Sequence, residues 1–321
     1  MSIEGKNPVS GLGPGVLLVL LTAVVSGVST FLNFYAVQGT SSDAFVTVRN
    51  LVVAGLLIPV ALLGGRSVHL HLRGADWGRL LAIGLLGGAI PFLLFFHGLA
   101  LASAAGGATT ASFGYRTLFL MAAVLAVVVL RERLSARWFA AAALLLVGNA
   151  LLLALTAPIW TDGTAYVLTA TALWAGEYTL SKRTLRDLPS GVVGLGRMGF
   201  GAVFLSGYLA VTGQWGSVGA FTGTVWSWVG LSALLLTAFV GSWYAGLQRV
   251  GLGAATSALV LGFPVTWALA LVVRGGPVAL PQAAGAVLVV LGVVVVLGAV
   301  SWREVARSLA AAFGRPDRST S

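Results

Sequence analysis

Ten stretches of mostly apolar residues, each close to the roughly 20 residues that a helix needs to cross a bilayer, constrain this chain most. None alternates polar and apolar residues in the way that a membrane barrel strand requires, so each is predicted to be a helix. Only 9% of the 321 residues are charged, whereas soluble domains carry about a quarter. The sequence therefore predicts an all-α integral membrane protein. Its ten transmembrane helices are expected at about 12–38, 43–63, 76–101, 106–130, 137–157, 163–183, 190–212, 225–249, 253–273 and 280–300.

The basic residues fall on one side of this arrangement. If the N-terminus is cytoplasmic, the inner segments hold fifteen Lys and Arg residues, and the outer loops hold only Arg274. This bias is the positive-inside signal, and it predicts that both termini are cytoplasmic. The excess of 19 Lys and Arg over 9 Asp and Glu thus indicates cytoplasmic loops and not a nucleic-acid partner. The inner residues are Lys6, Arg66, Arg73, Arg79, Arg131, Arg133, Arg137, Lys182, Arg183, Arg186, Arg249, Arg303, Arg307, Arg315 and Arg318.

The chain also contains a weak internal repeat. A shift of 148 residues lays the sixth apolar segment on the first, and a shift of 144 fits better towards the end. Each unit has five helices, an odd number, so the second unit must enter the membrane inverted relative to the first. Two inverted repeats are typical of secondary transporters with a site between the halves. The matching pairs are Arg49 and Arg197, Ala54 and Ala202, Gly98 and Gly246, Leu99 and Leu247, Gly114 and Gly262, and, under the second shift, Gly148 and Gly292.

The repeat divides the chain into four parts. Residues 1–11 form a cytoplasmic N-terminus, and 12–157 form the first five-helix repeat. The second repeat covers 163–300. Residues 301–321 form a basic cytoplasmic tail, which is expected to lie along the anionic inner leaflet.

Two of the ionisable residues inside the apolar segments are predicted to meet. Glu177 and Arg197 lie at equal depth on successive helices, so they are expected to form an ion pair. One interpretation is a fixed strut between the two helices. The other makes Glu177 a proton-coupling carboxylate. Both interpretations remain open, because an intramembrane charge must face protein or water in either case.

The other two are arginines. Arg116 lies near the expected midplane without an obvious counter-ion, so it either holds an anionic group of a solute or donates to backbone carbonyls at a helix break. Arg49 is the repeat mate of Arg197 and is expected to play a structural role near the outer face. Its expected partners are Asp43, or Ser29 and Asn33, unless it extends outward to the interface.

Aromatic side chains accompany Arg116 at matching depths. Aromatic walls with a few polar anchors are typical of small-molecule sites, although any single ring is more often an ordinary packing or interface-belt residue. Pro91 and Pro264 are expected to interrupt their helices, and discontinuous helices often mark a transporter's site. The candidate wall residues are Phe96, Tyr115, Trp174, Tyr178, Trp243, Tyr244, Phe263 and Trp267, and His97 is interpreted as a structural histidine.

Other classes of protein fit less well. There is no cysteine and only three histidines, so no cofactor or metal site is predicted. A primary pump would need a nucleotide-binding sequence, which the short loops do not contain. An integral-membrane transferase is improbable for lack of clustered acids and histidines. A lipid flippase is the closest alternative, since an inverted fold with Arg116 could move an anionic headgroup.

Four segments of the sequence resemble those of a known family. The segment Leu130–Ser135, the helix with Gly148, the run Phe95–Leu101 and the sequence Leu173-Trp174-Ala175 resemble EamA-type exporters of the drug/metabolite transporter superfamily. The resemblance covers about residues 12–300. It implies a plasma-membrane carrier that exports amino acids or other small metabolites. It also implies a central cavity lined by the first, third, fourth, sixth, eighth and ninth helices.

The chain departs from that family pattern in two places. The second repeat lacks the Glu-containing junction, so Glu132 is expected only to balance its arginine neighbours at the cytoplasmic face. Arg116 stands where a proline is often found, which changes what the cavity accepts. The sequence as a whole predicts a secondary transporter that works by alternating access, with Arg116 holding a carboxylate-bearing solute.

Overall fold

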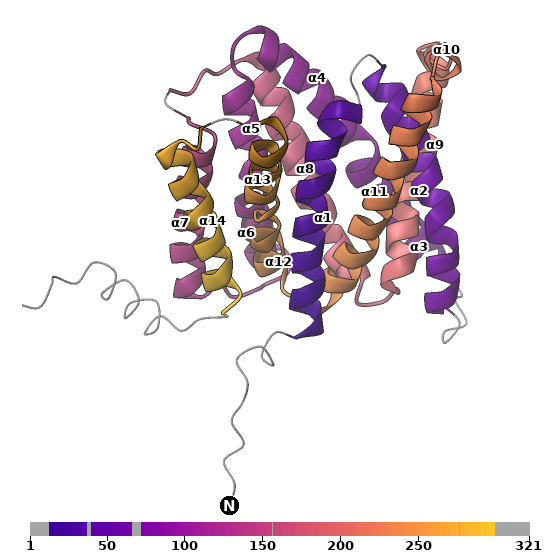
Figure 1. Cartoon of the computed structure of the whole chain (residues 1–321). Coiled ribbons are helices and arrows are strands. Elements are labelled where there is room, and N and C mark those ends of the chain that lie inside the picture. Colours follow the sequence, from indigo (N-terminus) through magenta and orange to yellow (C-terminus); the bar gives the residue numbers. More distant parts are fainter. Residues whose placement is uncertain (1–12, 37–39, 66–71, 156, 276, 299–321) are drawn as a thin grey trace, which may run out of the picture.

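The computed structural model describes residues 13–36, 40–65, 72–155, 157–275 and 277–298, and these form a bundle of helices that run up and down (Figure 1). Pro14 at the start of the bundle and Val296 at its end lie on the same face, at the bottom of Figure 1. The predicted tail, residues 301–321, and the predicted N-terminus, residues 1–11, lie outside the described residues. The helices are α1 (Pro14–Ala36), α2 (Ser42–Gly65), α3 (Gly74–Gly88), α4 (Ile90–Ala104), α5 (Ala108–Arg116), α6 (Leu118–Val128), α7 (Ala136–Leu152), α8 (Asp162–Thr184), α9 (Ser190–Val211), α10 (Gly216–Gly219), α11 (Gly223–Arg249), α12 (Leu252–Leu259), α13 (Gly262–Arg274) and α14 (Leu280–Val296).

Ten crossings account for these helices, as predicted. Seven crossings are single helices of 17 to 27 residues, namely α1, α2, α7, α8, α9, α11 and α14. Each of the other three is made of two helices in line: α3 with α4, α5 with α6, and α12 with α13. The short α10 is an addition that the apolar pattern did not indicate.

Proline explains two of the three breaks. Pro91 lies in the first turn of α4, just after the break at Ala89, and Pro264 lies in the first turn of α13. A proline lacks the N–H that would continue the helix before it, so the break falls on its N-terminal side. The third break, at Thr117, has no proline. There the Thr117 hydroxyl and backbone N–H both donate to the Gly114 carbonyl oxygen, which tightens the turn.

The packing of the helices follows the predicted inverted repeat. Helix α1 packs against α11, and its repeat mate α8 packs against α4 and α3. The close approaches also correspond: a Cβ on Gly246 of α11 would lie 3.3 Å from the Gly15 oxygen of α1, and a Cβ on Gly98 of α4 would lie 2.8 Å from the Gly163 oxygen of α8. Both glycine pairs are related by the shift of 148 residues. The two repeats therefore pack against each other through equivalent helix contacts.

The last helix of the first repeat, α7, packs against the last helix of the second repeat, α14. A Cβ on Gly148 of α7 would lie 2.8 Å from the Gly285 oxygen of α14, and a Cβ on Gly292 of α14 would lie 3.2 Å from the Ala141 oxygen of α7. Small residues at such crossings let helices approach closely, which is how membrane helices gain packing energy. These contacts follow the shift of 144 residues. The fold class predicted from the sequence is confirmed.

Charge is distributed unevenly over the two ends of the bundle. The end that carries Pro14 and Val296 holds nine of the described basic residues, and the opposite end holds Arg274. The nine residues are Arg73, Arg79, Arg131, Arg133, Arg137, Lys182, Arg183, Arg186 and Arg249. The chain is thus a multi-pass membrane protein with one strongly basic face.

Candidate functional site

A small cavity of about 60 Å³ lies in the middle of the bundle, between the two repeats. It borders the break between α5 and α6 and the break between α12 and α13. Its walls come from α1, α5, α6, α8, α11, α12 and α13, which are five of the six crossings that the family resemblance implies. The lining residues are Ser26, Thr30, Tyr115, Arg116, Leu118, Phe119, Tyr178, Phe239, Thr256, Leu259, Val260, Gly262 and Phe263.

Arg116 is the charged residue in this lining. It ends α5, one residue before the break at Thr117, and its side chain is half-buried. Its Nη1 donates to Asn149 Oδ1 of α7 at 3.2 Å, and its guanidinium lies 4.0 Å from the centre of the Phe263 ring. This hydrogen bond goes to a side-chain amide and not to a backbone carbonyl. Among the described residues, no carboxylate lies within ion-pair distance of Arg116.

Asn149 was not among the residues selected from the sequence. It is buried, and its Nδ2 donates to the Leu145 carbonyl oxygen at 2.8 Å, so its Oδ1 is turned towards Arg116. A polar residue directly after the repeat glycine Gly148, in an otherwise apolar helix, was the available signal. Asn149 therefore orients the guanidinium without neutralising it.

Three of the predicted aromatic wall residues line the cavity. Tyr115, Tyr178 and Phe263 surround Arg116, and Phe119 and Phe239, which the sequence analysis did not select, complete the ring. Tyr115 contacts Phe263 edge to face, with the ring centres 6.2 Å apart. The result is a π-rich wall around one cation.

The other predicted wall residues lie elsewhere. Trp174, Trp243 and Tyr244 are buried behind the cavity wall, where Trp243 packs on Tyr178 with ring centres 4.7 Å apart. Phe96 lines a separate pocket at the end of the bundle opposite Pro14. Trp267 is half-buried on α13 and does not line the central cavity. Periodicity could place these rings at the right depth but not on the right side of their helices.

Glu177 and Arg197 meet beside the cavity, as their depth indicated. Arg197 Nε lies 3.7 Å from Glu177 Oε2, and both side chains are buried. Glu177 Oε1 accepts hydrogen bonds from the Ser181 hydroxyl and, at 2.7 Å, from the Tyr244 hydroxyl. The carboxylate of Glu177 therefore joins α8, α9 and α11, and it does not line the cavity.

The same cluster closes the break between α3 and α4. Gly87 has a carbonyl oxygen that accepts from Arg197 Nη2 at 3.2 Å and from Trp174 Nε1 at 3.1 Å. Asn50 Nδ2 donates to the Gly88 oxygen at 3.4 Å. A break inside a membrane frees carbonyl groups that must find donors within the protein. Arg197 and Trp174 have this task here.

Sequence and structure comparisons agree with the geometry. The profile of the EamA-like transporter family matches residues 13–154 and again 162–298, once for each five-helix unit. The chain belongs to the EamA-like transporter family. A crystal structure described only as that of a protein shares the fold at a TM-score of 0.69 with 19% identity, over 87% of this chain and 96% of the other. No curated protein matches the sequence.

The structure gives Glu132, in the junction before α7, a different role from the one expected from the sequence. In this EamA-like chain, Glu132 Oε1 accepts the backbone N–H of Leu252 at 2.9 Å, and Oε2 accepts that of Gly253 at 3.4 Å. The expected balance with the neighbouring arginines was wrong, because no arginine among the described residues lies within ion-pair distance of Glu132. A carboxylate at a helix N-terminus satisfies free N–H groups and the helix dipole. Glu132 of the first repeat thus caps α12 of the second.

Arg49 also has a different partner from those expected. Its Nε and Nη2 donate to Asn50 Oδ1 at 3.3 and 3.1 Å, and the side chain is buried. None of the hydrogen bonds or ion pairs of the described residues joins it to Asp43, Ser29 or Asn33. The reason is orientation: Asn33 donates to Ser29 on its own helix and accepts from α11, so this pair faces away from α2.

Proposed function

We propose that this EamA-like protein is a secondary transporter that exports a small, carboxylate-bearing metabolite through the central cavity by alternating access. The observation that carries the proposal is Arg116, a half-buried cation in the cavity whose neighbours are a neutral amide and a π-face. A guanidinium in a site of low dielectric is suited to bind a carboxylate through two parallel hydrogen bonds. The family itself transports small solutes, and the anionic group is the finer step.

The balance of charge inside the bundle supports an anionic solute. Away from the helix ends, the described crossings hold three arginines, the buried Arg49 and Arg197 and the half-buried Arg116, but only one carboxylate, Glu177. Glu177 faces Arg197, and Arg49 is held by a neutral amide. A net positive interior favours entry of an anion, and Arg116 is the arginine that such an anion reaches in the cavity.

The size of the cavity supports alternating access. Its volume of about 60 Å³ is well below the roughly 300 Å³ at which small-molecule sites begin, so the cavity is too small to hold a solute in this conformation. Opening requires movement of helices that border the cavity. The breaks at Thr117 and Leu261 are equivalent under the shift of 144 residues and provide one flexible point in each repeat.

The basic end of the bundle sets the proposed orientation. Nine basic residues at the end with Pro14 and Val296, against Arg274 at the other, favour a cytoplasmic location of that end. Both chain termini then face the cytoplasm, and the family resemblance favours the plasma membrane.

For Glu177 the geometry favours the strut over proton coupling. One oxygen of the Glu177 carboxylate accepts hydrogen bonds from two hydroxyl groups, and the other lies 3.7 Å from Arg197 Nε, so the group holds α8, α9 and α11 together. It is also fully buried and outside the cavity lining, so a solute or water in the cavity does not reach it. Transport without coupling at Glu177 proceeds by exchange or by facilitated diffusion.

The proposal is tested with purified protein in proteoliposomes. Counterflow of a panel of radiolabelled amino acids and simple carboxylates identifies solutes that the wild type moves. Arg116→Ala should abolish their transport, and Arg116→Lys should retain part of it, because lysine keeps the charge but loses the paired donors. Arg274→Ala, at the outer end, is the matched control and should transport normally.

Normal transport by Arg116→Ala would refute the assignment. A second arm follows a fluorescent phospholipid across the same vesicles. Lipid movement that depends on Arg116, without movement of any soluble anion, would replace the metabolite transporter with a flippase.

A further inference from the structure

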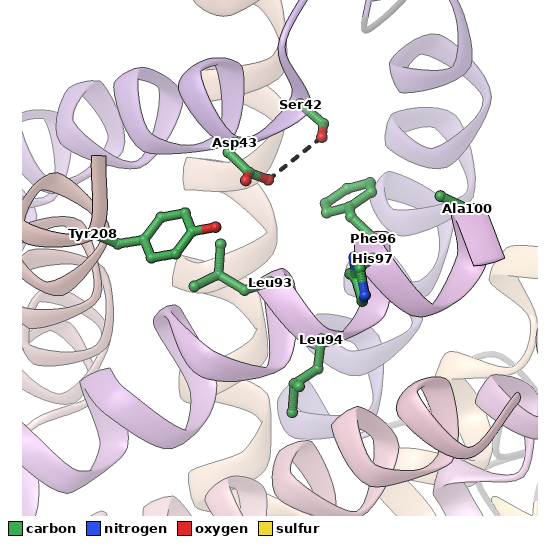
Figure 2. Close-up of a pocket in the computed structure, with 8 residues that line it drawn as sticks. All are labelled: Ser42, Asp43, Leu93, Leu94, Phe96, His97, Ala100 and Tyr208. Carbon is green, nitrogen blue, oxygen red and sulfur yellow. Dashed lines mark hydrogen bonds between the residues drawn. The ribbon is translucent and has the colours of Figure 1, made fainter. Parts of the chain in front are cut away.

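A second pocket opens at the end of the bundle opposite Pro14, away from the central cavity (Figure 2). It lies between the start of α2, the middle and end of α4, and the end of α9. Its volume of about 380 Å³ is within the range of small-molecule sites, unlike the closed central cavity. The lining residues are Ser42, Asp43, Leu93, Leu94, Phe96, His97, Ala100 and Tyr208.

One side of this outer pocket is acidic. The Asp43 carboxylate and the Tyr208 hydroxyl point into the same space in Figure 2. Asp43 Oδ1 accepts a long hydrogen bond of 3.5 Å from the Ser42 hydroxyl. Among the described residues, no cation lies within ion-pair distance of Asp43. A half-buried carboxylate therefore faces a cavity with most of its acceptor capacity unused.

The other side is apolar and aromatic. Leu93, Leu94 and Phe96 of α4 form it together with the imidazole ring of His97, and the Phe96 ring lies across the space from Asp43. An ammonium group is attracted both to a carboxylate and to the face of an aromatic ring, while an apolar body fits against leucine side chains. We propose that the outer pocket binds an organic ammonium ion with an apolar or aromatic body, its nitrogen at Asp43 and Tyr208.

Contacts between rings connect this pocket to the central cavity. Phe96 contacts Phe95 with ring centres 5.7 Å apart, Phe95 contacts Tyr115 at 5.0 Å, and Tyr115 contacts Phe263 at 6.2 Å. Phe263 in turn lies under Arg116. A ligand in the outer pocket therefore touches the first ring of a continuous row that ends at the central cation. The two sites carry opposite charges, so they select different chemical groups.

A simpler role for Asp43 must be separated from this one. An acid in the first turn of a helix stabilises the positive end of the helix dipole, and Asp43 occupies that position in α2. Asp162 occupies the same position in α8, at the same end of the bundle, but it is exposed and does not line the pocket. Asp162→Asn therefore reproduces the loss of a first-turn charge without touching the proposed site.

The test measures binding of 2-phenylethylammonium to the full-length protein by titration calorimetry. Nanodiscs of phosphatidylglycerol are used because that headgroup has no ammonium, and empty nanodiscs give the background. The wild type should bind the ammonium at least tenfold more tightly than the neutral 2-phenylethanol or the anionic 3-phenylpropionate. Asp43→Asn should weaken ammonium binding at least tenfold, and Asp162→Asn should change it less than twofold.

Two further variants keep the test decisive. Ala100→Phe fills the pocket from its exposed rim and should also abolish ammonium binding, even if Asp43→Asn folds poorly. Arg116→Ala should leave ammonium binding unchanged, so the binding test of the outer pocket is independent of the proposed transport function. The proposal is overturned if the wild type does not bind the ammonium, if Asp43→Asn and Asp162→Asn have equal effects, or if Arg116→Ala weakens binding as much as Asp43→Asn.

Discussion

The contact between α9 and the end of α3 can be tested with a single methyl group. Gly201 of α9 packs on Gly88, the last residue of α3 before the break at Ala89. A Cβ added to Gly201 would lie 2.7 Å from Gly88 Cα and 2.8 Å from its carbonyl carbon and oxygen. All three neighbours are backbone atoms, so no side chain can rotate away. Gly201→Ala must push the two helices apart.

The size of the effect follows from these distances. Carbon atoms in contact prefer about 3.5–4.0 Å, so α3 and α9 must separate by roughly 1 Å. Overpacking of this kind typically costs about 1–3 kcal/mol. The gain in helix propensity from glycine to alanine, up to about 1 kcal/mol in water, is smaller here because helices persist in the detergent-unfolded state. We expect a net destabilisation of about 1–2 kcal/mol.

Gly199→Ala is the matched control. It lies two residues earlier on the same helix, and nothing lies within 4 Å of an added Cβ. Its expected change is a small stabilisation, below about 0.5 kcal/mol. Both variants are compared by titration with sodium dodecyl sulfate in mixed micelles, followed by tryptophan fluorescence. If Gly201→Ala proved as stable as Gly199→Ala, the close approach of α3 and α9 would be refuted.

Three other predictions concern polar contacts. Glu132→Ala removes the cap of α12 and should lower the free energy of unfolding by about 1–3 kcal/mol in the same titration, whereas Asp187→Ala, at an exposed ion pair, should change it by less than about 1 kcal/mol. Asn149→Asp places a carboxylate beside Arg116 and should abolish binding of a transported anion in a thermal-shift assay, whereas Asn149→Ala should weaken it only a few-fold; equal effects would contradict the role given to the guanidinium. Glu177→Gln breaks a buried pair and should cost roughly 3 kcal/mol or more, yet an imposed pH gradient should affect transport by the folded variant and by the wild type equally. A pH-gradient response present in the wild type and absent from the folded variant would reassign Glu177 to proton coupling.

Some expectations from the sequence depended only on the order of residues along the chain. The number of crossings follows from the length and polarity of each segment, because each segment partitions into the bilayer according to its own composition. The pairing of Glu177 with Arg197 followed from depth alone, since adjacent helices hold residues of equal depth side by side. The inverted repeat followed from matched residues such as Gly98 and Gly246, which the structure places in equivalent contacts.

The composition of the site could be predicted only in part. Arg116, Tyr115, Tyr178 and Phe263 were selected by depth and do line the cavity, but depth gave no means of separating them from Trp174 or Trp243. What distinguishes these groups is the rotation of each helix about its axis. That rotation is set by which faces of neighbouring helices fit together, and this information is spread over both repeats.

The sequence by itself thus determined the membrane fold and the two repeats, and it predicted the pairing of Glu177 with Arg197, because these depend on local composition and on helical rise. Only the tertiary structure decided that Glu132 caps α12, that Asn149 holds Arg116, and that the helix breaks at Thr117 without a proline. The first two features depend on contacts between segments distant in sequence, whereas the third depends on a local turn at Thr117. The free energy of such contacts exists only once the helices have packed.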